Sequence, residues 1–203
     1  MVESCSMSGV AAAIILFAIW ITRYLGEEYA WVNRKIIHFS IVPAVLFYNA
    51  GLIARELFAA AAFLFGAFQL FTHIKKDELS WYQIKSNYGE VFFAFSAAAV
   101  AWFIEKEYAV VILLVMAISD GVTGILRFFY FKAKGFDVRL RKHWIGSLGY
   151  LISALIIVAI IFPQSSIVSK VICAGILTLA EYQRFLDDNL AVPLVGILIK
   201  GIL

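Results

Sequence analysis

Long apolar runs separated by short polar stretches occupy the chain almost from end to end. An α-helix needs roughly 17 to 25 predominantly apolar residues to cross a bilayer. The pattern predicts seven or eight membrane-spanning helices. They are expected at residues 9–25, 36–53, 57–71, 91–104, 109–131, 147–162, 167–185 and 190–203, the last short enough to lie partly at the interface. We therefore expect an all-α integral membrane protein, a polytopic bundle of transmembrane helices, with a single domain over residues 1–203.

The composition agrees with this pattern. Of the 203 residues, 63% are hydrophobic and 15% charged, whereas a soluble domain has about half apolar and about a quarter charged residues. Cys5 and Cys173 are too few for a disulfide framework or a four-ligand metal site. The residues before the first run include Glu3 and no basic residue, unlike the start of a signal peptide. We therefore expect this helix to be retained and not cleaved.

Lysine and arginine are distributed unevenly between the predicted loops. Thirteen of the 17 basic residues fall on one side of the predicted helices and four on the other. Because cytoplasmic loops carry the excess of positive charge, the richer side is predicted to be cytoplasmic and the N-terminus to lie outside the cell membrane. The residues with candidate chemistry fall on this same cytoplasmic side.

Two polar groups stand at the start of predicted helices. Arg34, Lys35 and His38 are spaced so that they share one helix face. Glu90 stands at the start of the fourth predicted helix, residues 91–104. Each group has an alternative interpretation: the first as a basic membrane anchor, and Glu90 as a partner for the helix dipole.

Asp120 is an isolated acid inside the fifth apolar run. Asp120, Gly124 and Arg127 lie along one helix face, and Gly121 and Gly124 would let a ligand or another backbone approach closely. An unpaired charge at this depth is costly, so an intramembrane acid is a candidate functional residue. The alternatives are a structural Asp–Arg pair or close packing of helices through small residues.

A basic loop follows the fifth run and leads into the sixth. Arg141 and Lys142 would offer positive charge to phosphates. Gly146 and Ser147, at the start of the next helix, would present free N–H groups to an anion. The alternative is a loop that sets the topology and contacts anionic lipid head groups.

Acidic residues return near the C-terminus. Glu181 and Asp188 are seven residues apart and can face the same way, while Asp187, Asp188 or Asn189 could simply cap a helix. Carboxylates hold Mg²⁺ that bridges phosphate oxygens, and basic residues balance charge during phosphoryl transfer. Because the chain contains neither a P-loop nor a G-x-G-x-x-G motif, a nucleotide site would be of another type.

The order of these motifs resembles the family of dolichol kinases, phytol kinases and CTP-dependent diacylglycerol kinases, polytopic membrane proteins. The resemblance covers residues 34–195. It is carried by Arg34-Lys35 with His38, Gly89-Glu90, Asp120-Gly121, Lys142 with Gly146-Ser147, and Glu181 with Asp188-Asn189-Leu190 and Pro193. The short chain looks like the compact prokaryotic or archaeal members.

This resemblance implies transfer of the γ-phosphate of CTP, or of ATP, to a polyprenol- or dolichol-like alcohol, with Mg²⁺ as cofactor. The partners would be the lipid alcohol, the nucleoside triphosphate and membrane lipids, and no nucleic acid. The implied catalytic residues are Asp120, Lys142, Glu90 and His38. The implied nucleotide- and phosphate-binding residues are Arg34, Lys35, Gly121, Gly124, Arg127, Arg141, His143, Gly146, Ser147 and Asn189. The implied metal ligands are Asp120, Glu181 and Asp188.

The chain departs from the family pattern in the loop before the sixth helix. The family's K-S-x-E-G-S is replaced here by a sequence with His143 and Ile145 at the serine and acid positions. This leaves the choice between CTP and ATP open. Two other functions remain possible on the same residues: a cytidylyltransferase acting on a lipid phosphate, and a small proton- or cation-coupled transporter.

Overall fold

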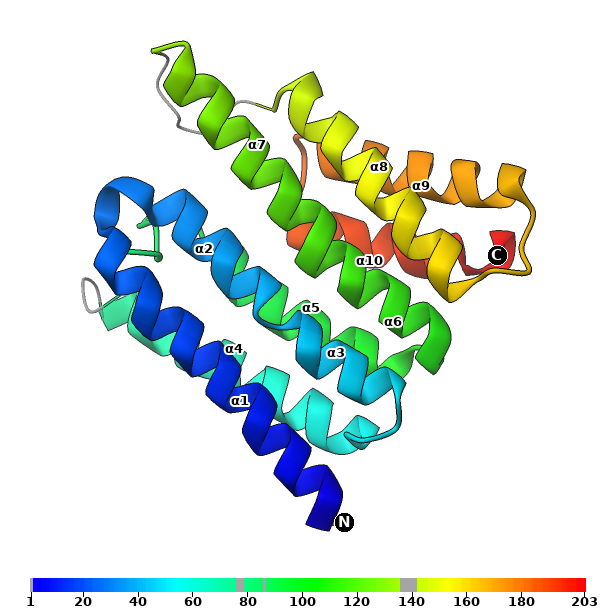
Figure 1. Cartoon of the computed structure of the whole chain (residues 1–203), viewed down its shortest axis with the longest axis horizontal. Helices are drawn as coiled ribbons and strands as arrows, with labels where there is room; N and C mark the ends of the chain where they lie inside the picture. Colours follow the sequence, from blue (N-terminus) through cyan, green and yellow to red (C-terminus); the bar gives the residue numbers. More distant parts are fainter. Residues whose placement is uncertain (1, 76–78, 86, 136–141) are drawn as a thin grey trace.

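The computed structural model describes residues 2–75, 79–85, 87–135 and 142–203. The described residues form helices and no strand, with one isolated bridge between Ile84 and Asn87. In chain order the helices are α1 (Val2–Thr22), α2 (Ala30–Phe39), α3 (Val42–Asn49), α4 (Arg55–Lys75), α5 (Gly89–Phe103), α6 (Lys106–Leu114), α7 (Asp120–Ala133), α8 (Trp144–Ile161), α9 (Ile167–Tyr182) and α10 (Asp188–Leu198). Most of the helices run roughly along one common direction, and α9 and α10 lie at an angle to it (Figure 1). Short 3-10 turns are η1 (Arg23–Leu25), η2 (Glu27–Tyr29) and η4 (Lys200–Ile202), and η3 (Val115–Ser119) is a π-helical turn.

The all-α prediction is confirmed for the described residues, but the predicted count of seven or eight spans is not. Four described helices are long and apolar enough to cross a membrane: Ser4–Leu25, Arg55–Lys75, Lys106–Ala133 and Trp144–Ile161. The helices α5 and α10 are apolar but shorter, with 15 and 11 residues. The structure therefore supports a membrane protein with four candidate spans.

The predicted second span is broken in two. It was expected as one helix over residues 36–53, but α2 begins at Ala30 and ends at Phe39, and α3 begins at Val42. Pro43 lies in the first turn of α3. Proline has no N–H to donate to the preceding turn and clashes with it, so it favours a new helix over continuation of α2.

The continuous helix formed by α6, η3 and α7 is the centre of the bundle. In an apolar stretch of 18 residues of this helix, 72% of the residues are buried inside the structure. The corresponding fractions are 17% for the span that contains α1 and 28% for α8. The helices α2 and α8 pack against α7, and α3 and α5 against α6. In contrast, α1 carries exposed apolar side chains such as Leu16, Phe17 and Trp20, as a helix facing lipid would.

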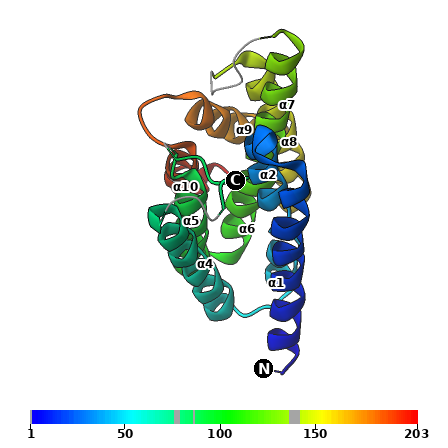
Figure 2. The same ribbon diagram turned by 90° about the vertical axis from the view of Figure 1, so that its left-hand side faces the viewer.

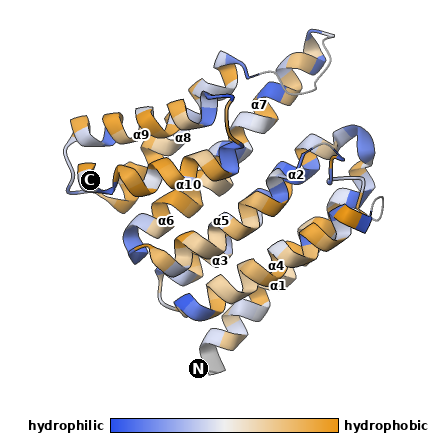
Figure 3. Ribbon diagram, turned by 180° about the vertical axis from the view of Figure 1, so that it is seen from behind, coloured by the Kyte–Doolittle hydropathy of each residue, from blue (hydrophilic) through white to orange (hydrophobic). Residues whose placement is uncertain are grey.

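The polar residues gather toward one half of this arrangement. The starts of α2, α5, α8 and α10 and the ends of α7 and α9 lie toward the same side of the bundle (Figure 1). Coloured by hydropathy, these ends are hydrophilic, as are the starts of α4 and α6 at the opposite side, while most of each long helix is hydrophobic (Figure 3). This half of the bundle contains the residues singled out from the sequence.

Candidate functional site

Asp120 begins α7 and is 4% exposed. Its Oδ2 atom lies 2.5 Å from Nζ of Lys35 and 3.1 Å from Nδ1 of His38. Lys35 and His38 are one turn apart on α2, which packs against α7. The predicted common face of these two residues is thus the face that meets Asp120.

The two glycines beside Asp120 make room for α2. A Cβ added at Gly124 would lie 2.8 Å from Cγ of Lys35, and one added at Gly121 would lie 2.7 Å from Cζ of Phe39. Such distances are shorter than ordinary van der Waals contact, so a side chain at either position would require the Lys35 or Phe39 side chain to move. The close approach predicted at these glycines is made by another helix of the same chain.

Glu90, in the first turn of α5, is 5% exposed and forms a second acid–base group. Its Oε1 atom lies 2.7 Å from Nδ1 of His73, which comes from the end of α4. Its Oε2 atom lies 3.5 Å from Nη1 of Arg34, and the same nitrogen donates a 2.6 Å hydrogen bond to Asn87 Oδ1. Glu90 therefore does more than accompany a helix dipole, because it joins α2, α4 and α5.

Lys142 is the centre of a third group, at the meeting point of three elements. Its Nζ atom lies 2.9 Å from Oε1 of Glu181 and 2.9 Å from Oδ2 of Asp188, and it also donates to the Glu181 carbonyl. Arg127 approaches Glu181 at 3.6 Å. Burial disfavours the charged amine, but the two carboxylates outweigh it and raise the pKa of Lys142. Glu181 and Asp188 face the same way, as predicted, whereas Arg127 pairs with Glu181 and not with Asp120.

The start of α8 differs from the expectation of free N–H groups. The amides of Gly146 and Ser147 both donate to the His143 carbonyl, at 3.0 and 3.4 Å. Gly146 is instead a packing position: an added Cβ would lie 2.9 Å from Cγ of Arg127, and Thr123 Oγ1 donates to the Gly146 carbonyl at 3.0 Å. The hydroxyl of Ser147 is buried and has no hydrogen-bond partner among the described residues.

His143 lies outside this polar region. Its side chain caps α8 by accepting a 3.3 Å hydrogen bond from the amide of Ile145. Its ring packs on Tyr130, with ring centroids 4.5 Å apart. The structure gives His143 a capping and packing role, and Arg141, predicted beside it, lies outside the described residues.

Asn189 connects the second and third groups. Its side-chain amide donates to Asp187 Oδ1 at 3.0 Å and to Asp188 Oδ1 at 3.2 Å. A Cβ added at Gly89 would lie 2.9 Å from Asn189 Nδ2 and would collide with the guanidinium of Arg34. The capping interpretation is confirmed for Asp187, whose Oδ1 atom accepts a 3.0 Å hydrogen bond from the backbone N–H of Asn189 at the start of α10. Burial and the neighbouring Asp188 raise the pKa of Asp187.

The three groups together form one buried region, which we call the polar cluster. Several of its atoms are buried without a hydrogen-bond partner in the described chain, among them Asp120 Oδ1, His38 Nε2 and Glu181 Oε2. Buried polar atoms without partners are costly and are therefore candidates for contact with a ligand or water. The polar cluster consists of Arg34, Lys35, His38, His73, Asn87, Glu90, Asp120, Arg127, Lys142, Glu181, Asp188 and Asn189.

The carboxylates predicted to bind one metal ion lie in two places. Within the described part of the chain, no group of three or more His, Cys, Asp or Glu residues is placed to hold a metal ion. Asp120 lies with Lys35, while Glu181 and Asp188 meet around Lys142. Mg²⁺ is commonly bound by one or two carboxylates together with substrate phosphates and water. Glu181 and Asp188 are the two predicted ligands that come together, and both contact Nζ of Lys142.

Sequence reasoning missed three polar residues of this region. His73 and Asn87 contact members of the second group, and Gln69, which is 1% exposed, accepts from the Tyr82 hydroxyl at 2.9 Å. For Gln69 and His73 the available signal was a polar side chain within or just after an apolar run, the same signal that singled out Asp120. Comparison with models of known families, with curated proteins and with solved structures gives no match for this chain.

Proposed function

We propose that the protein is a membrane lipid-alcohol kinase that transfers the γ-phosphate of CTP or ATP to a polyprenol- or dolichol-like alcohol. The observation that carries this proposal is the polar cluster itself, in which basic side chains and carboxylates alternate inside an apolar helix bundle. Phosphoryl transfer needs positive charge around the phosphates and a group that receives the hydroxyl proton. An apolar acceptor needs access from the bilayer, which a helix bundle offers.

The nucleotide would enter at the group around Lys142. The side chains of Lys142 and Asp188 are 18% and 21% exposed, whereas that of Asp120 is 6% exposed. Lys142 and Arg127 would contact the phosphates, with Glu181 and Asp188 as the residues that would hold Mg²⁺. When bound, Mg²⁺ would neutralise charge on the phosphate oxygens.

His38 is the residue best placed to receive the hydroxyl proton. Its Nδ1 atom faces Asp120 and its Nε2 atom is buried without a partner among the described residues. A carboxylate on Nδ1 fixes the tautomer in which Nε2 accepts a proton. The alcohol proton would pass to Nε2 as the alcohol oxygen bonds to the γ-phosphorus, and the bond from that phosphorus to the bridging oxygen would break to release nucleoside diphosphate.

Transfer of label tests this function directly. The full chain in nanodiscs is incubated with Mg²⁺, γ-labelled CTP or ATP, and farnesol, geranylgeraniol or dioleoylglycerol. We expect labelled lipid phosphate and nucleoside diphosphate. Asp120→Asn should lower the rate at least about a hundredfold, while Glu107→Gln, an exposed carboxylate at the start of α6, serves as the control.

The outcomes separate the candidate functions. Release of pyrophosphate with a lipid phosphate as acceptor would indicate nucleotidyl transfer and not kinase chemistry. Absence of label in every lipid, with the nucleotide shown to bind, would refute the kinase. Near-normal transfer by Asp120→Asn would remove Asp120 from the reaction.

We also propose a multi-pass orientation in the cell membrane with the N-terminus outside and the polar cluster toward the cytoplasm. The alternating directions of eight segments, with α2–α3 and α6–α7 each counted as one, support this orientation together with the uneven loop charge. Cys5 is exposed near the N-terminus and Cys173 is buried. A membrane-impermeant maleimide should therefore label intact cells at Cys5 and should fail with Cys5→Ser; labelling only after permeabilisation would reverse the orientation.

A further inference from the structure

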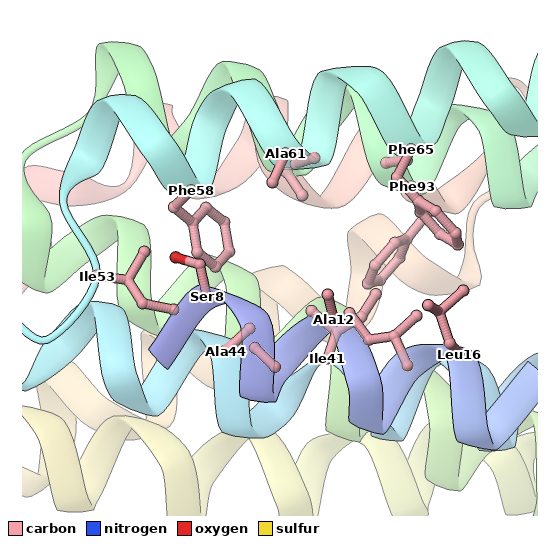
Figure 4. A pocket seen from close by; sticks show the side chains of 15 residues that line it. Ser8, Ala12, Leu16, Ile41, Ala44, Ile53, Phe58, Ala61, Phe65 and Phe93 are labelled. Carbon is pink, nitrogen blue, oxygen red and sulfur yellow. The ribbon is translucent and has the colours of Figure 1, made fainter. Parts of the chain in front are cut away.

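An apolar pocket of about 280 Å³ lies between α1, α3, α4 and α5. Its lining is hydrophobic apart from Ser8, whose hydroxyl donates to the Ser4 carbonyl at 2.9 Å. The close view shows side chains of α1 and α4 facing each other across it (Figure 4). A pocket with no free polar group in its lining suits a hydrocarbon ligand and gives a polar one nothing to bind. Representative lining residues are Ala12, Leu16, Ile41, Ala61, Phe65 and Phe93.

The pocket lies where the bilayer would reach it. Its walls include α1 and α4, two of the candidate spans. The helix α1 packs mainly on α2 and α3, and α4 mainly on α5. Turned by 90°, the molecule shows α1 on one side and α4 with α5 on the other (Figure 2). Leu16 lines the pocket and is nevertheless 64% exposed, so this wall borders the surroundings of the protein.

One end of the pocket borders the polar cluster. A smaller cavity lined by Arg34, His38 and Glu90 shares three lining residues with the large pocket, namely Ile41, Phe65 and Phe93. The ring of Phe93 stacks on His38, with centroids 4.1 Å apart. A chain lying in the pocket would therefore point one end toward His38.

We propose that this pocket holds the hydrocarbon tail of the acceptor alcohol and so places its hydroxyl at His38. This inference rests on the proposed kinase function. On α4 the lining extends from Phe58 to Phe65, roughly 10 Å along the helix axis at about 1.5 Å per residue. Bilayer and pocket are similarly apolar, so a tail gains little hydrophobic free energy by moving between them. The pocket consequently selects its ligand by shape and positions it.

Two neighbouring alanines on α4 provide a matched test. Ala60 and Ala61 are both exposed, but only Ala61 lines the pocket. With farnesol as acceptor, Ala61→Phe should raise KM about tenfold or more by filling the pocket. Ala60→Phe should stay within about twofold of the unaltered protein. The kcat at saturating farnesol should change less than KM in both variants.

Photolabelling gives a second readout that does not depend on turnover. Farnesol carrying a diazirine on its tail should label pocket residues of α1 and α4, and Ala61→Phe should abolish this labelling while Ala60→Phe retains it. If farnesol is phosphorylated but the two variants behave alike in KM and labelling, the pocket assignment is wrong and the kinase stands. If the pocket is labelled but no alcohol is phosphorylated, the kinase is refuted, and with it the assignment of a substrate to the pocket.

Discussion

The Asp120 group and the Lys142 group are both acid–base contacts inside an apolar bundle, but their side chains differ in how far they are exposed. In the first, the side chains of Lys35 and Asp120 are 7% and 6% exposed, and two packed helices supply both partners. In the second, Lys142 and Asp188 are 18% and 21% exposed, and the partners come from the ends of helices. Under the proposed function, the closed group would hold the reacting hydroxyl and the partly open group would admit the charged nucleotide.

Asp120→Asn should produce the largest loss of stability. It would leave Lys35 buried without a counter-charge, and breaking a buried pair in this way costs about 3–5 kcal/mol. The free energy of unfolding in a detergent titration measures the effect. The double variant Lys35→Met with Asp120→Asn removes both charges and should recover most of the loss; a double variant as unstable as the single one would show that the charge is not the cause.

Gly124→Ala should follow, because the added methyl would overlap the Lys35 side chain. Overpacking of this kind costs about 1–3 kcal/mol. Gly175→Ala in α9 is the control, since nothing lies within 4 Å of a Cβ there. The same unfolding titration applies, and equal stability of the two variants would mean that α2 and α7 are not held as closely as described.

Lys142→Met should lower the free energy of unfolding by less, about 1–2 kcal/mol, because its ion pairs are partly exposed and such pairs contribute less than fully buried ones. Glu181 keeps Arg127 at 3.6 Å, and Asp188 is partly exposed. Unfolding should therefore show a smaller effect than for Asp120→Asn, while phosphate transfer is lost in both. A stability loss equal to that of Asp120→Asn would erase the difference between the closed and the open group.

Asp187→Asn should have the smallest effect, visible as a change with pH. Burial and Asp188 raise the Asp187 pKa above 3.8 in the folded protein, so folding favours the protonated form. Its stabilising contribution is full below the ordinary pKa and is lost as pH rises through the raised value. The unaltered protein should thus lose thermal stability relative to Asp187→Asn as pH rises from acidic to neutral, and Asn keeps an oxygen for the α10 cap. A difference in Tm that does not change with pH would contradict this.

Much of the candidate site was predictable because it depends on helix periodicity. Lys35 and His38 were expected on one face, and both contact Asp120. Periodicity also explains why the alternative interpretation, a structural Asp120–Arg127 pair, is not observed: residues seven apart on one face are separated by about 10 Å along the axis, and Arg127 contacts Glu181 instead. The contact of His73 with Glu90 depends on how α4 packs against α5, and no local spacing encodes it.

The span count was less predictable, since hydropathy reports composition and not the length of ordered helix. The predicted run 91–104 corresponds to α5, whose 15 residues extend about 23 Å, less than the roughly 30 Å hydrocarbon core. The interruption between α2 and α3 had a visible signal in Pro43, but the apolar character of the run continues past it. The sequence pattern therefore predicted that the chain is helical, but it did not predict the lengths of the individual helices.

The π-helical turn η3 uncouples the rotational phase of α7 from that of α6. The amide of Asp120 donates to the carbonyl of Val115, five residues earlier, so this turn contains one residue more than an α-helical turn would. If the same residues instead formed a regular α-helix, the span would change in length by only about 1.5 Å, but everything after the turn would be rotated by about 100° about the helix axis. The polar face of α7 would then turn away from α2 while the helix still crossed the same thickness of membrane, so one inserted residue sets the direction in which Asp120 faces.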